Sequence, residues 1–354
     1  MAAMKVLSDR YKPEGAGTSG GMGDVAYFRD KHLNRRVVIK TLKDGTEARR
    51  LVDEMKALTL LRSKHVVQLY DIVETVSDKG VNGIGIVLEY IEGKDFEVGS
   101  LCADYNYLRV LWQVACGIRD IHSHSIVHRD IKPNNIRVDE EGVVKIMDFG
   151  LARTYDQAKT GSIIGTPIFM APELWGGAQI NFTDAVDVYA FGVTCLALLS
   201  NHPPANLTAR PPLPVALSDV IALTETLPIE VPNIIHRCLE LDAKLRPSMD
   251  EIVETLKRQL TKDKHKALIT MGNTTHTISK DNRQAKISVG NIGSLSIQYD
   301  GLNFLVTGVN GDVSFNNLAA EVGQILPGCC VITFKGNQRR VFVTFDVSHP
   351  EVTA

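Results

Sequence analysis

The sequence lacks the features that mark membrane proteins and secreted proteins. Its longest apolar run, "VYAFGVTCLALL" at 188–199, falls short of the roughly 20 residues that a membrane-spanning helix needs. The first residues do not follow the basic, apolar and small-residue order of a signal peptide. We therefore expect a chain without a membrane span, located in the cytoplasm.

Cysteine motifs are also missing. No CxxC pair and no Cys/His spacing typical of zinc is present, so we expect reduced thiols rather than a metal site or a disulfide framework. The adjacent pair near residue 330 fits the core of a strand better than redox chemistry. The six cysteines are Cys102, Cys116, Cys195, Cys238, Cys329 and Cys330.

The composition shows no strong excess of charge. The formal net charge is −2, which gives no reason to expect nucleic acid as a partner. The chain is 44% hydrophobic and 23% charged, which is ordinary for a globular protein. Its 354 residues allow two or three domains.

Strand-like segments come first and helical segments follow. Apolar residues gather in "RRVVIKTL" and "IGIVLEYI", as in strands, whereas 46–62 has the periodicity of a helix. Ser248, with Glu251 three residues later, predicts a capping box. This order predicts an α+β unit of two lobes with a cleft between them. Further helical patterns lie at 107–122, 184–199, 231–242 and 248–260.

The composition changes after Leu260. A charged segment, "TKDKHK", precedes short β-prone runs such as "SLSIQY", "FLVTG" and "CCVITF". Turn signals at Asp300-Gly301 and Asn310-Gly311 separate these runs. The pattern predicts a separate all-β domain.

One loop carries many costly polar groups between apolar neighbours. It reads "HRDIKPNNI" at 128–136, and buried polar groups of this kind must find partners. "MDFG" follows at 147–150 and "GTPIFMAPE" at 165–173, while "GGMGDV" and "VVIK" precede them, the latter ending at Lys40. In this order the motifs match a known signature set.

With these motifs, residues 10–260 resemble a Hanks-type Ser/Thr protein kinase, with "GGMG" and "MAPE" as in bacterial members. The resemblance implies a bilobal protein kinase fold at 10–262, with an N-lobe at about 10–92 and a C-lobe at about 93–262. A linker at 263–275 and a small all-β domain of the sandwich type at 276–354 complete the predicted organisation.

The resemblance also implies ATP and Mg²⁺, or Mn²⁺ in its place, as cofactors and proteins as substrates. Asp130 would be the catalytic base and Lys132 would steady the transferred phosphoryl group. Asn135 and Asp148 would bind the metal. Lys40 would hold the nucleotide phosphates.

Lys40 stands in an apolar strand and needs anionic partners. Glu54 lies on the apolar stripe of the helix at 46–62, between Leu51 and Leu58, and is the favoured partner. Asp53 or Glu47 would be alternatives.

Several further residues would contact the nucleotide. Backbone of the hinge at 88–91 would meet adenine, and Asp95 would bond the ribose. Val25 and Val38, together with Ile136 or Val138, would enclose the base. Thr18 stands where the family has the first glycine of its loop, which leaves the affinity for ATP open. The predicted ATP contacts are Gly20, Gly21, Gly23, Val25, Val38, Lys40, Glu54, Glu89, Ile91 and Asp95.

Lys132 and the "GTP" segment resemble Ser/Thr rather than tyrosine kinases, and Thr166 would bond toward Asp130 and Lys132. Two other sets match structural features of the family. Glu173 and Arg246 match an ion pair of the lower lobe. A packed column would consist of Leu58, Leu69, His128 and Phe149.

The segment between "DFG" and "APE" offers hydroxyl groups near Arg129. In the family this arginine pairs with a phosphate on that segment, so autophosphorylation at Thr160 or Ser162 is expected. Constitutive activity is the alternative.

Two other functions remain open, a kinase-fold scaffold with little turnover and an adaptor that binds phosphopeptides. The C-terminal runs resemble the last strands of a forkhead-associated β-sandwich, but the Arg and Ser/His set that binds phosphothreonine is not found. We therefore expect this domain to serve as an interaction or regulatory module.

Overall fold

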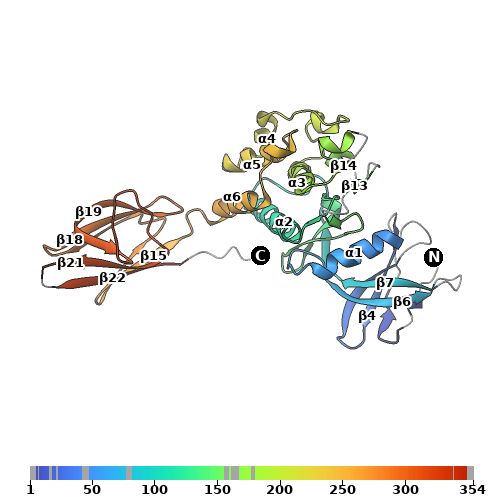
Figure 1. The fold of residues 1–354 in the computed structure, drawn as a ribbon, viewed down its shortest axis with the longest axis horizontal. Helices are drawn as coiled ribbons and strands as arrows, with labels where there is room; N and C mark the ends of the chain where they lie inside the picture. The colour runs from blue at the N-terminus through green and yellow to red at the C-terminus, as the bar shows by residue number, and fades with distance from the viewer. Residues whose placement is uncertain are drawn as a thin grey trace. The chain divides into compact units, whose positions relative to one another are not determined.

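The computed structural model describes most of the chain and divides it into two compact units (Figure 1). The described residues are 5–6, 8–15, 18–20, 23–41, 48–76, 82–154, 159–160, 167–176, 180–337 and 339–348. One unit comprises residues 1–256 and the other residues 257–353.

The N-terminal part of the first unit is a twisted antiparallel sheet with one helix. Its strands follow the order β1-β6-β7-β5-β4-β2, with β3 paired to β4. Val37 and Ile39 of one strand are fully buried, because alternate residues face the core. The elements are β1 Lys5–Val6, β2 Tyr11–Pro13, β3 Thr18–Gly20, β4 Gly23–Asp30, β5 Arg35–Thr41, α1 Ala48–Leu60, β6 Leu69–Val76 and β7 Asn82–Glu89.

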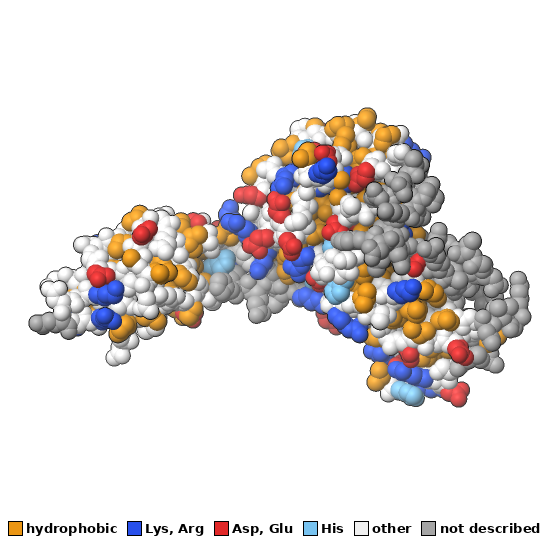
Figure 2. Space-filling model, in the orientation of Figure 1, with side chains coloured by type: hydrophobic (Ala, Val, Ile, Leu, Met, Phe, Trp, Pro, Cys, Tyr) orange, Lys and Arg blue, Asp and Glu red, His pale blue; other side chains and the backbone are white. Residues whose placement is uncertain are grey.

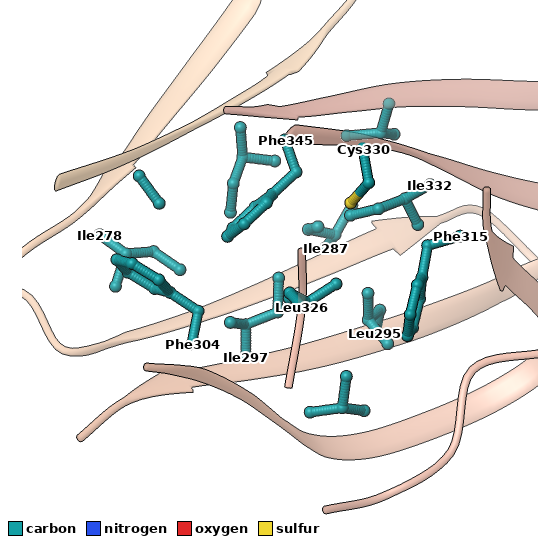
Figure 3. Packing of buried hydrophobic residues seen from close by; sticks show 14 of the residues in the cluster. Ile278, Ile287, Leu295, Ile297, Phe304, Phe315, Leu326, Cys330, Ile332 and Phe345 are labelled. Atoms are coloured by element: carbon teal, nitrogen blue, oxygen red, sulfur yellow. The ribbon is translucent and has the colours of Figure 1, made fainter. Parts of the chain in front are cut away.

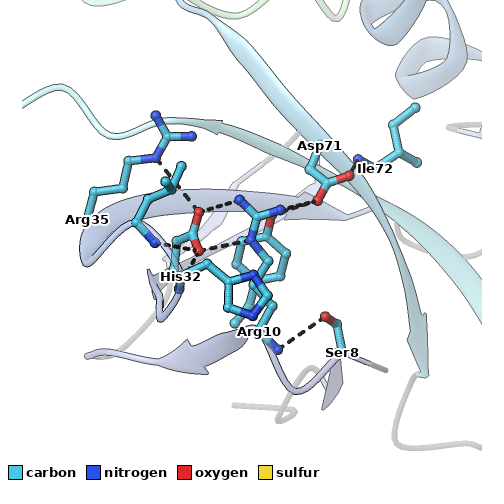
Figure 4. Close-up of polar contacts among 9 residues, drawn as sticks. Ser8, Arg10, His32, Arg35, Asp71 and Ile72 are labelled. Atoms are coloured by element: carbon cyan, nitrogen blue, oxygen red, sulfur yellow. Dashed lines mark hydrogen bonds and ion pairs between the residues drawn. The ribbon is translucent and has the colours of Figure 1, made fainter.

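A polar network ties three strands of this sheet together (Figure 4). Arg10 donates from Nε to Oδ1 of Asp30 at 2.9 Å and from Nη2 to Oδ2 at 2.6 Å. Its Nη1 reaches Oδ2 of Asp71 at 3.2 Å, and the Tyr11 hydroxyl donates to the same oxygen at 2.7 Å. The hydrogen bond from Arg10 lowers the pKa of Asp30 to about 2. Charged groups with matched partners thus link β2 and β4, at one end of the strand order, to β6 near the other end.

Helices dominate the rest of the first unit. Asp104 caps the longest one by accepting a 2.9 Å hydrogen bond from the backbone of Tyr107. A second helix, almost wholly buried, forms the centre of this lobe. The main elements are β8 Gly93–Asp95, α2 Tyr105–Ser123, β9 Ile126–Val127, β10 Ile136–Asp139, β11 Val144–Ile146, α3 Asp184–Leu199, α4 Leu217–Leu223, α5 Glu230–Cys238 and α6 Met249–Thr261.

Short elements connect the helices. They are the 3₁₀ turns η1 Pro133–Asn135, η3 Pro167–Phe169, η4 Pro172–Trp175, η5 Ala205–Thr208 and η6 Ala243–Leu245, and the strands β12 Arg153–Thr154, β13 Lys159–Thr160 and β14 Ile180–Asn181.

The predicted capping box of α6 is half present. Oγ of Ser248 accepts from the backbone of Glu251 at 3.2 Å, as an N-cap does. The carboxylate of Glu251 instead contacts Arg237. Strands first and helices later confirm the α+β class, and no described helix has the length and hydropathy that a bilayer crossing requires.

The second unit contains an all-β domain with one core (Figure 3). Its strands follow the order β16-β15-β22-β21-β19-β18-β17, with β20 paired to β19. Inward side chains from all parts of this sheet, among them Phe304, Phe315 and Phe345, meet in one hydrophobic cluster. On the face of this domain that Figure 2 shows, red and blue side chains are few and scattered. The strands are β15 Lys266–Met271, β16 Thr274–Ile278, β17 Gln284–Val289, β18 Gly293–Tyr299, β19 Phe304–Phe315, β20 Leu318–Ala319, β21 Cys329–Lys335 and β22 Arg340–Ser348.

One of the two predicted turns is present and the other is not. Oδ1 of Asp300 accepts hydrogen bonds from the backbone N–H groups of Leu302 and Asn303, and Gly301 has a φ of +108°. Asn310-Gly311, in contrast, lies inside β19, so the prediction of a turn there was wrong. Gly311 has a φ of +83°, and a Cβ there would lie 2.3 Å from the carbonyl oxygen of Ile292. The glycine therefore permits a close backbone approach within a strand.

The predicted linker at 263–275 has to be shortened, because Lys266–Met271 forms β15 between β16 and β22. Hydrogen bonds also fix the residues just before it. The backbone of Asp263 donates to Gly301 at 2.8 Å, and its Oδ1 accepts from Arg283 at 2.6 Å. The charged run "TKDKHK" thus marks the junction, but its last lysine is already a strand residue.

We predict that a fragment of residues 257–354 folds by itself and that one of residues 276–354 does not. The shorter fragment lacks β15, which supplies backbone hydrogen bonds to both neighbouring strands. Circular dichroism during urea titration should show a cooperative transition for the longer fragment alone. A transition of equal midpoint in both would contradict the placement of β15 as an interior strand.

Candidate active site

Lys40 on β5 lies between two carboxylates from different parts of the chain. Its Nζ is 2.7 Å from Oε2 of Glu54 on α1 and 2.9 Å from Oδ1 of Asp148, which follows β11. Glu54 is almost fully buried. The alternation of β5 places Lys40 on the face opposite Val37 and Ile39, which belong to the core.

Burial alone would lower the pKa of Lys40, but the carboxylates of Glu54 and Asp148 raise it above its ordinary value. Burial would likewise raise the pKa of Asp148, but the Lys40 charge lowers it. Both groups therefore remain charged at neutral pH. A site that binds phosphates and metal ions needs such charges, a cation for the phosphates and an anion for the metal ion.

Asp148 has an unusual backbone conformation, with a φ of +60°. The left-handed region is uncommon for residues other than glycine and persists where the surroundings impose it. The next residue, Phe149, is fully buried and packs edge-on against His128 at 4.7 Å between ring centroids. Leu58 of the predicted column is buried as well, and Leu69 is half-buried.

The polar loop at 128–136 brings three predicted residues together. Lys132 places Nζ 2.8 Å from Oδ2 of Asp130. Asn135 donates from Nδ2 to the same oxygen at 2.9 Å and to the carbonyl oxygen of Asp130 at 2.8 Å. Asp130 is buried, and these contacts fix its carboxylate.

A fully buried carboxylate below the loop holds its backbone. Asp187 on α3 accepts hydrogen bonds at 2.8 Å from the backbone N–H groups of both His128 and Arg129. His122 on α2 contacts the same carboxylate through Nε2 at 2.9 Å. Burial would raise the pKa of Asp187, but the hydrogen bond from His122 and the neighbouring groups lower it. Sequence reasoning missed Asp187 and His122, and the signal was a carboxylate inside the apolar helix at 184–199.

Arg129 faces the segment that follows the "DFG" motif. Its φ is +68°, its Nε donates to the carbonyl oxygen of Leu151 at 2.5 Å, and its guanidinium lies 4.6 Å from the ring centre of Phe182. Phe182 comes directly after β14, whose Ile180 is paired with Thr160 on β13. Ser162 and Thr166 lie outside the described residues.

The glycine-rich segment that was predicted to contact ATP includes two paired antiparallel strands, β3 and β4. Backbone pairing joins Thr18 to Val25 and Gly20 to Gly23. Val25 is paired with Lys40 on β5, while Val38 is paired with Tyr27 on one side and Leu88 on the other. The structure thus places the valines and Lys40 on one face of the sheet. Gly21 lies outside the described residues.

The predicted hinge follows β7. Glu89 ends this strand, and its carboxylate contacts Nζ of Lys145 on β11 at 2.8 Å. Its backbone N–H donates to the carbonyl oxygen of Gln68 at 2.8 Å. Ile91 is buried just beyond. These contacts anchor the connection between the two lobes.

Ile136 or Val138 was expected to enclose the base from the lower lobe, as the floor of the cleft, and the structure differs from this expectation. Ile136 is fully buried and pairs with Ile146 in the lower lobe, and Val138 shares its strand face. Neither side chain therefore faces the hinge. The residue between them, Arg137, does, and it bonds to Ile91 and Asp95.

Glu173 and Arg246 form the ion pair that the sequence suggested. Nη1 and Nη2 of the arginine donate to the two carboxylate oxygens at 2.7 and 2.8 Å. The arginine also donates to the backbone carbonyl oxygens of Ala185 and Glu240 at 2.8 Å each. This bidentate pair links η4 to the loop before α6.

The donor set fits a magnesium ion. Asp148 offers carboxylate oxygens on a side chain that is 30% exposed. Asn135 directs Nδ2 to Asp130, which leaves its amide oxygen available for a cation. Mg²⁺ prefers such oxygen ligands and takes few of them from the protein. These two residues would hold it together with substrate phosphates.

Comparisons with known proteins agree with this arrangement. The protein kinase domain family matches residues 15–256. A serine/threonine-protein kinase of Corynebacterium efficiens is 34% identical over 224 residues, which are 60% of this chain and 42% of that protein. A probable serine/threonine-protein kinase of Clostridium acetobutylicum is 30% identical over 273 residues, 71% of this chain and 40% of that protein.

Similarity extends to eukaryotes. Mitogen-activated protein kinase 8 of Arabidopsis thaliana is 32% identical over 208 residues, 55% of this chain and 35% of that protein. The chain thus spans less than half the length of these curated relatives.

We predict that His122→Ala loosens the polar loop. The substitution removes a partner of the buried Asp187 carboxylate and should cost about 1–3 kcal/mol of unfolding free energy. Amide hydrogen exchange at His128 and Arg129 should become faster. His124→Ala is the matched control, because its exposed ring bonds the Asp120 carbonyl oxygen one turn back. Equal exchange in the two variants would speak against a role for His122 in holding the loop.

Proposed function

The chain belongs to the protein kinase family, and from this premise we propose that it is a Ser/Thr protein kinase. It transfers the γ-phosphoryl group of ATP to hydroxyl groups of protein substrates. The observation that carries the proposal is the convergence of Lys40, Glu54 and Asp148 at 2.7–2.9 Å. A scaffold without turnover would not need this buried charge arrangement, which costs desolvation.

Each charged group has a task in the reaction. Lys40, held by Glu54, binds the nucleotide phosphates, and Asp148 with Asn135 holds Mg²⁺, which neutralises phosphate charge when bound. Asp130 orients the acceptor hydroxyl and takes its proton. The bond from the γ-phosphorus to the bridging oxygen breaks as the bond to the acceptor oxygen forms, and ADP leaves. Lys132 neutralises charge on the transferred group.

Lys132 also supports specificity for Ser and Thr. Its Nζ lies 2.8 Å from Oδ2 of Asp130. From there it would contact the phosphoryl group as this group passes to the acceptor hydroxyl. The protein substrates would bind at this position. The cytoplasm remains the expected location, and the β domain at 266–348 remains an expected interaction or regulatory module.

Regulation by autophosphorylation is part of the proposal. The guanidinium of Arg129 lies beside the ring of Phe182. Phe182 comes directly after β14, the strand that pairs with Thr160 of β13. A phosphate on Thr160 or Ser162 would add about −1.5 to −2 charges and one to three charge-assisted hydrogen bonds to nearby cations. Such bonds would order the segment and complete the acceptor site.

We predict different defects for two aspartate variants. Asp130→Asn should lower kcat by about 10²–10⁴-fold, because the base is lost, while Mg²⁺-ATP still binds. Asp148→Asn should also weaken Mg²⁺-ATP binding, because a metal ligand is lost. Radiolabelled transfer to a protein substrate and calorimetric titration measure the two effects. A fully active Asp130→Asn variant would contradict the assignment of Asp130 as the base.

The Thr160→Ala, Ser162→Ala double variant should lose most of its activity if these hydroxyls accept the regulatory phosphate. Mass spectrometry after incubation with Mg²⁺-ATP should find phosphate on this segment of the wild type. Thr154→Ala is a control on the same segment. Full activity of the double variant, with no phosphate on the wild-type segment, would favour constitutive activity.

A further inference from the structure

Arg137 occupies a position that places its side chain at the hinge. It lies on β10, paired with Asp95 of β8 on one side and with Lys145 of β11 on the other. Alternation along the strand turns Ile136 and Val138 into the lower lobe. The intervening side chain therefore points to the opposite face.

Two hydrogen bonds fix the guanidinium. Nε donates to Oδ1 of Asp95 at 2.6 Å, and Nη1 donates to the carbonyl oxygen of Ile91 at 3.2 Å. The side chain of Arg137 is 25% exposed and that of Asp95 is 44% exposed. Both partners were predicted to contact the nucleotide, so one arginine joins two predicted contacts.

The neighbouring side chains hold the hinge from the upper lobe. The ring of Tyr90 packs edge-on against Tyr27 of β4, with 5.8 Å between centroids. Arg36 of β5 donates to the Tyr90 hydroxyl at 2.8 Å and lies 4.1 Å from its ring centre. The hinge thus contacts two arginines, Arg36 through the side chain of Tyr90 and Arg137 through the backbone of Ile91.

Arg137 is suited to fix a carboxylate that is otherwise mobile. A guanidinium has a rigid planar fork, so its bond to the Ile91 backbone sets where its Nε meets Asp95. A half-exposed aspartate without this partner would sample several rotamers, and a ligand would have to order it on binding. The hydrogen bond to Asp95 also raises the pKa of Arg137, so the guanidinium stays charged.

We propose that Arg137 is a positioning residue for the ribose of the nucleotide. It ties Asp95 to the hinge and presents the remaining acceptor capacity of the carboxylate to the ribose hydroxyls. The inference rests on the proposed function, since it assumes a nucleotide in the cleft. It predicts that recognition of the sugar depends on a residue that does not itself belong to the predicted contacts.

The test compares ATP with 2′-deoxy-ATP and 3′-deoxy-ATP on the full chain. Wild type should prefer ATP over at least one deoxy form by about tenfold, the equivalent of one charge-assisted hydrogen bond. Arg137→Ala should raise the KM for ATP by about the same factor, with kcat within about twofold, and should abolish the preference. Arg137→Lys, which retains the charge but not the fork, should fall between them.

A double-mutant cycle with Asp95→Asn adds a second criterion. Asp95→Asn alone should lose the same preference, and the double variant should be no worse than either single variant, because both changes remove one interaction. Arg36→Ala is the matched control, since it removes the hinge arginine that contacts the Tyr90 side chain and does not bond Asp95. It should retain the preference for ATP.

The preference is a ratio measured on one protein, so a loss of folded protein does not change it. An Arg137→Ala variant that keeps the wild-type preference and has only a lower Tm would show that Arg137 stabilises the fold alone, and this result would overturn the inference. Wild type that binds ATP and both deoxy forms equally would also overturn it. Failure of wild type to bind any nucleotide would instead contradict the proposed function.

Discussion

The site depends above all on the buried ammonium of Lys40. A cation at this depth is stable only if anionic groups surround it, and two carboxylates do so at 2.7 and 2.9 Å. Glu54 comes from α1, and Asp148 comes from the loop after β11 in the lower lobe. The sheet, the helix and the lower lobe are therefore held in one arrangement by a single charge. Removing either carboxylate would leave a buried charge without part of its compensation, which is far more costly than losing a surface ion pair.

A buried charge with several partners also holds the polar loop at 128–136. Asp187 is fully buried, yet it satisfies two backbone N–H groups and a histidine. This anchoring explains how Arg129 can hold a φ of +68°, a conformation that costs free energy in isolation. Asp148 has a similar φ and is held by Lys40. The strained backbone of the site is thus kept in place by buried charges, and those charges are kept in place by hydrogen bonds.

The sequence predicted what short-range patterns determine. Glu54 interrupts an apolar helical stripe and so pointed to a cation, and the helix at 184–199 matches α3 residue for residue. Pairing between strands that lie far apart in the sequence was harder to predict. Lys266–Met271 was assigned to a linker because of the charged run before it, and nothing local shows that it pairs with β22, far along the chain. Asn310-Gly311 has the composition of a turn, but the approach of the Ile292 carbonyl oxygen, a tertiary contact, determines its role.

Arg137 shows the same limit inside the site. Its apolar neighbours Ile136 and Val138 were the natural candidates for an apolar cleft floor. Strand alternation alone could have shown that these two side chains and that of Arg137 lie on opposite faces of β10, so that only one of the two faces lines the cleft. The sequence does not reveal which face lines the cleft, because the apolar side chains of Ile136 and Val138 would suit the cleft as well as the interior of the lower lobe. The structure decides through burial: Ile136 is fully buried in the lower lobe, so the hinge side receives a guanidinium. A charge can occupy this half-exposed position because Asp95 and the Ile91 carbonyl oxygen both accept from it. The polarity of the cleft floor therefore follows from packing on the opposite face of the same strand.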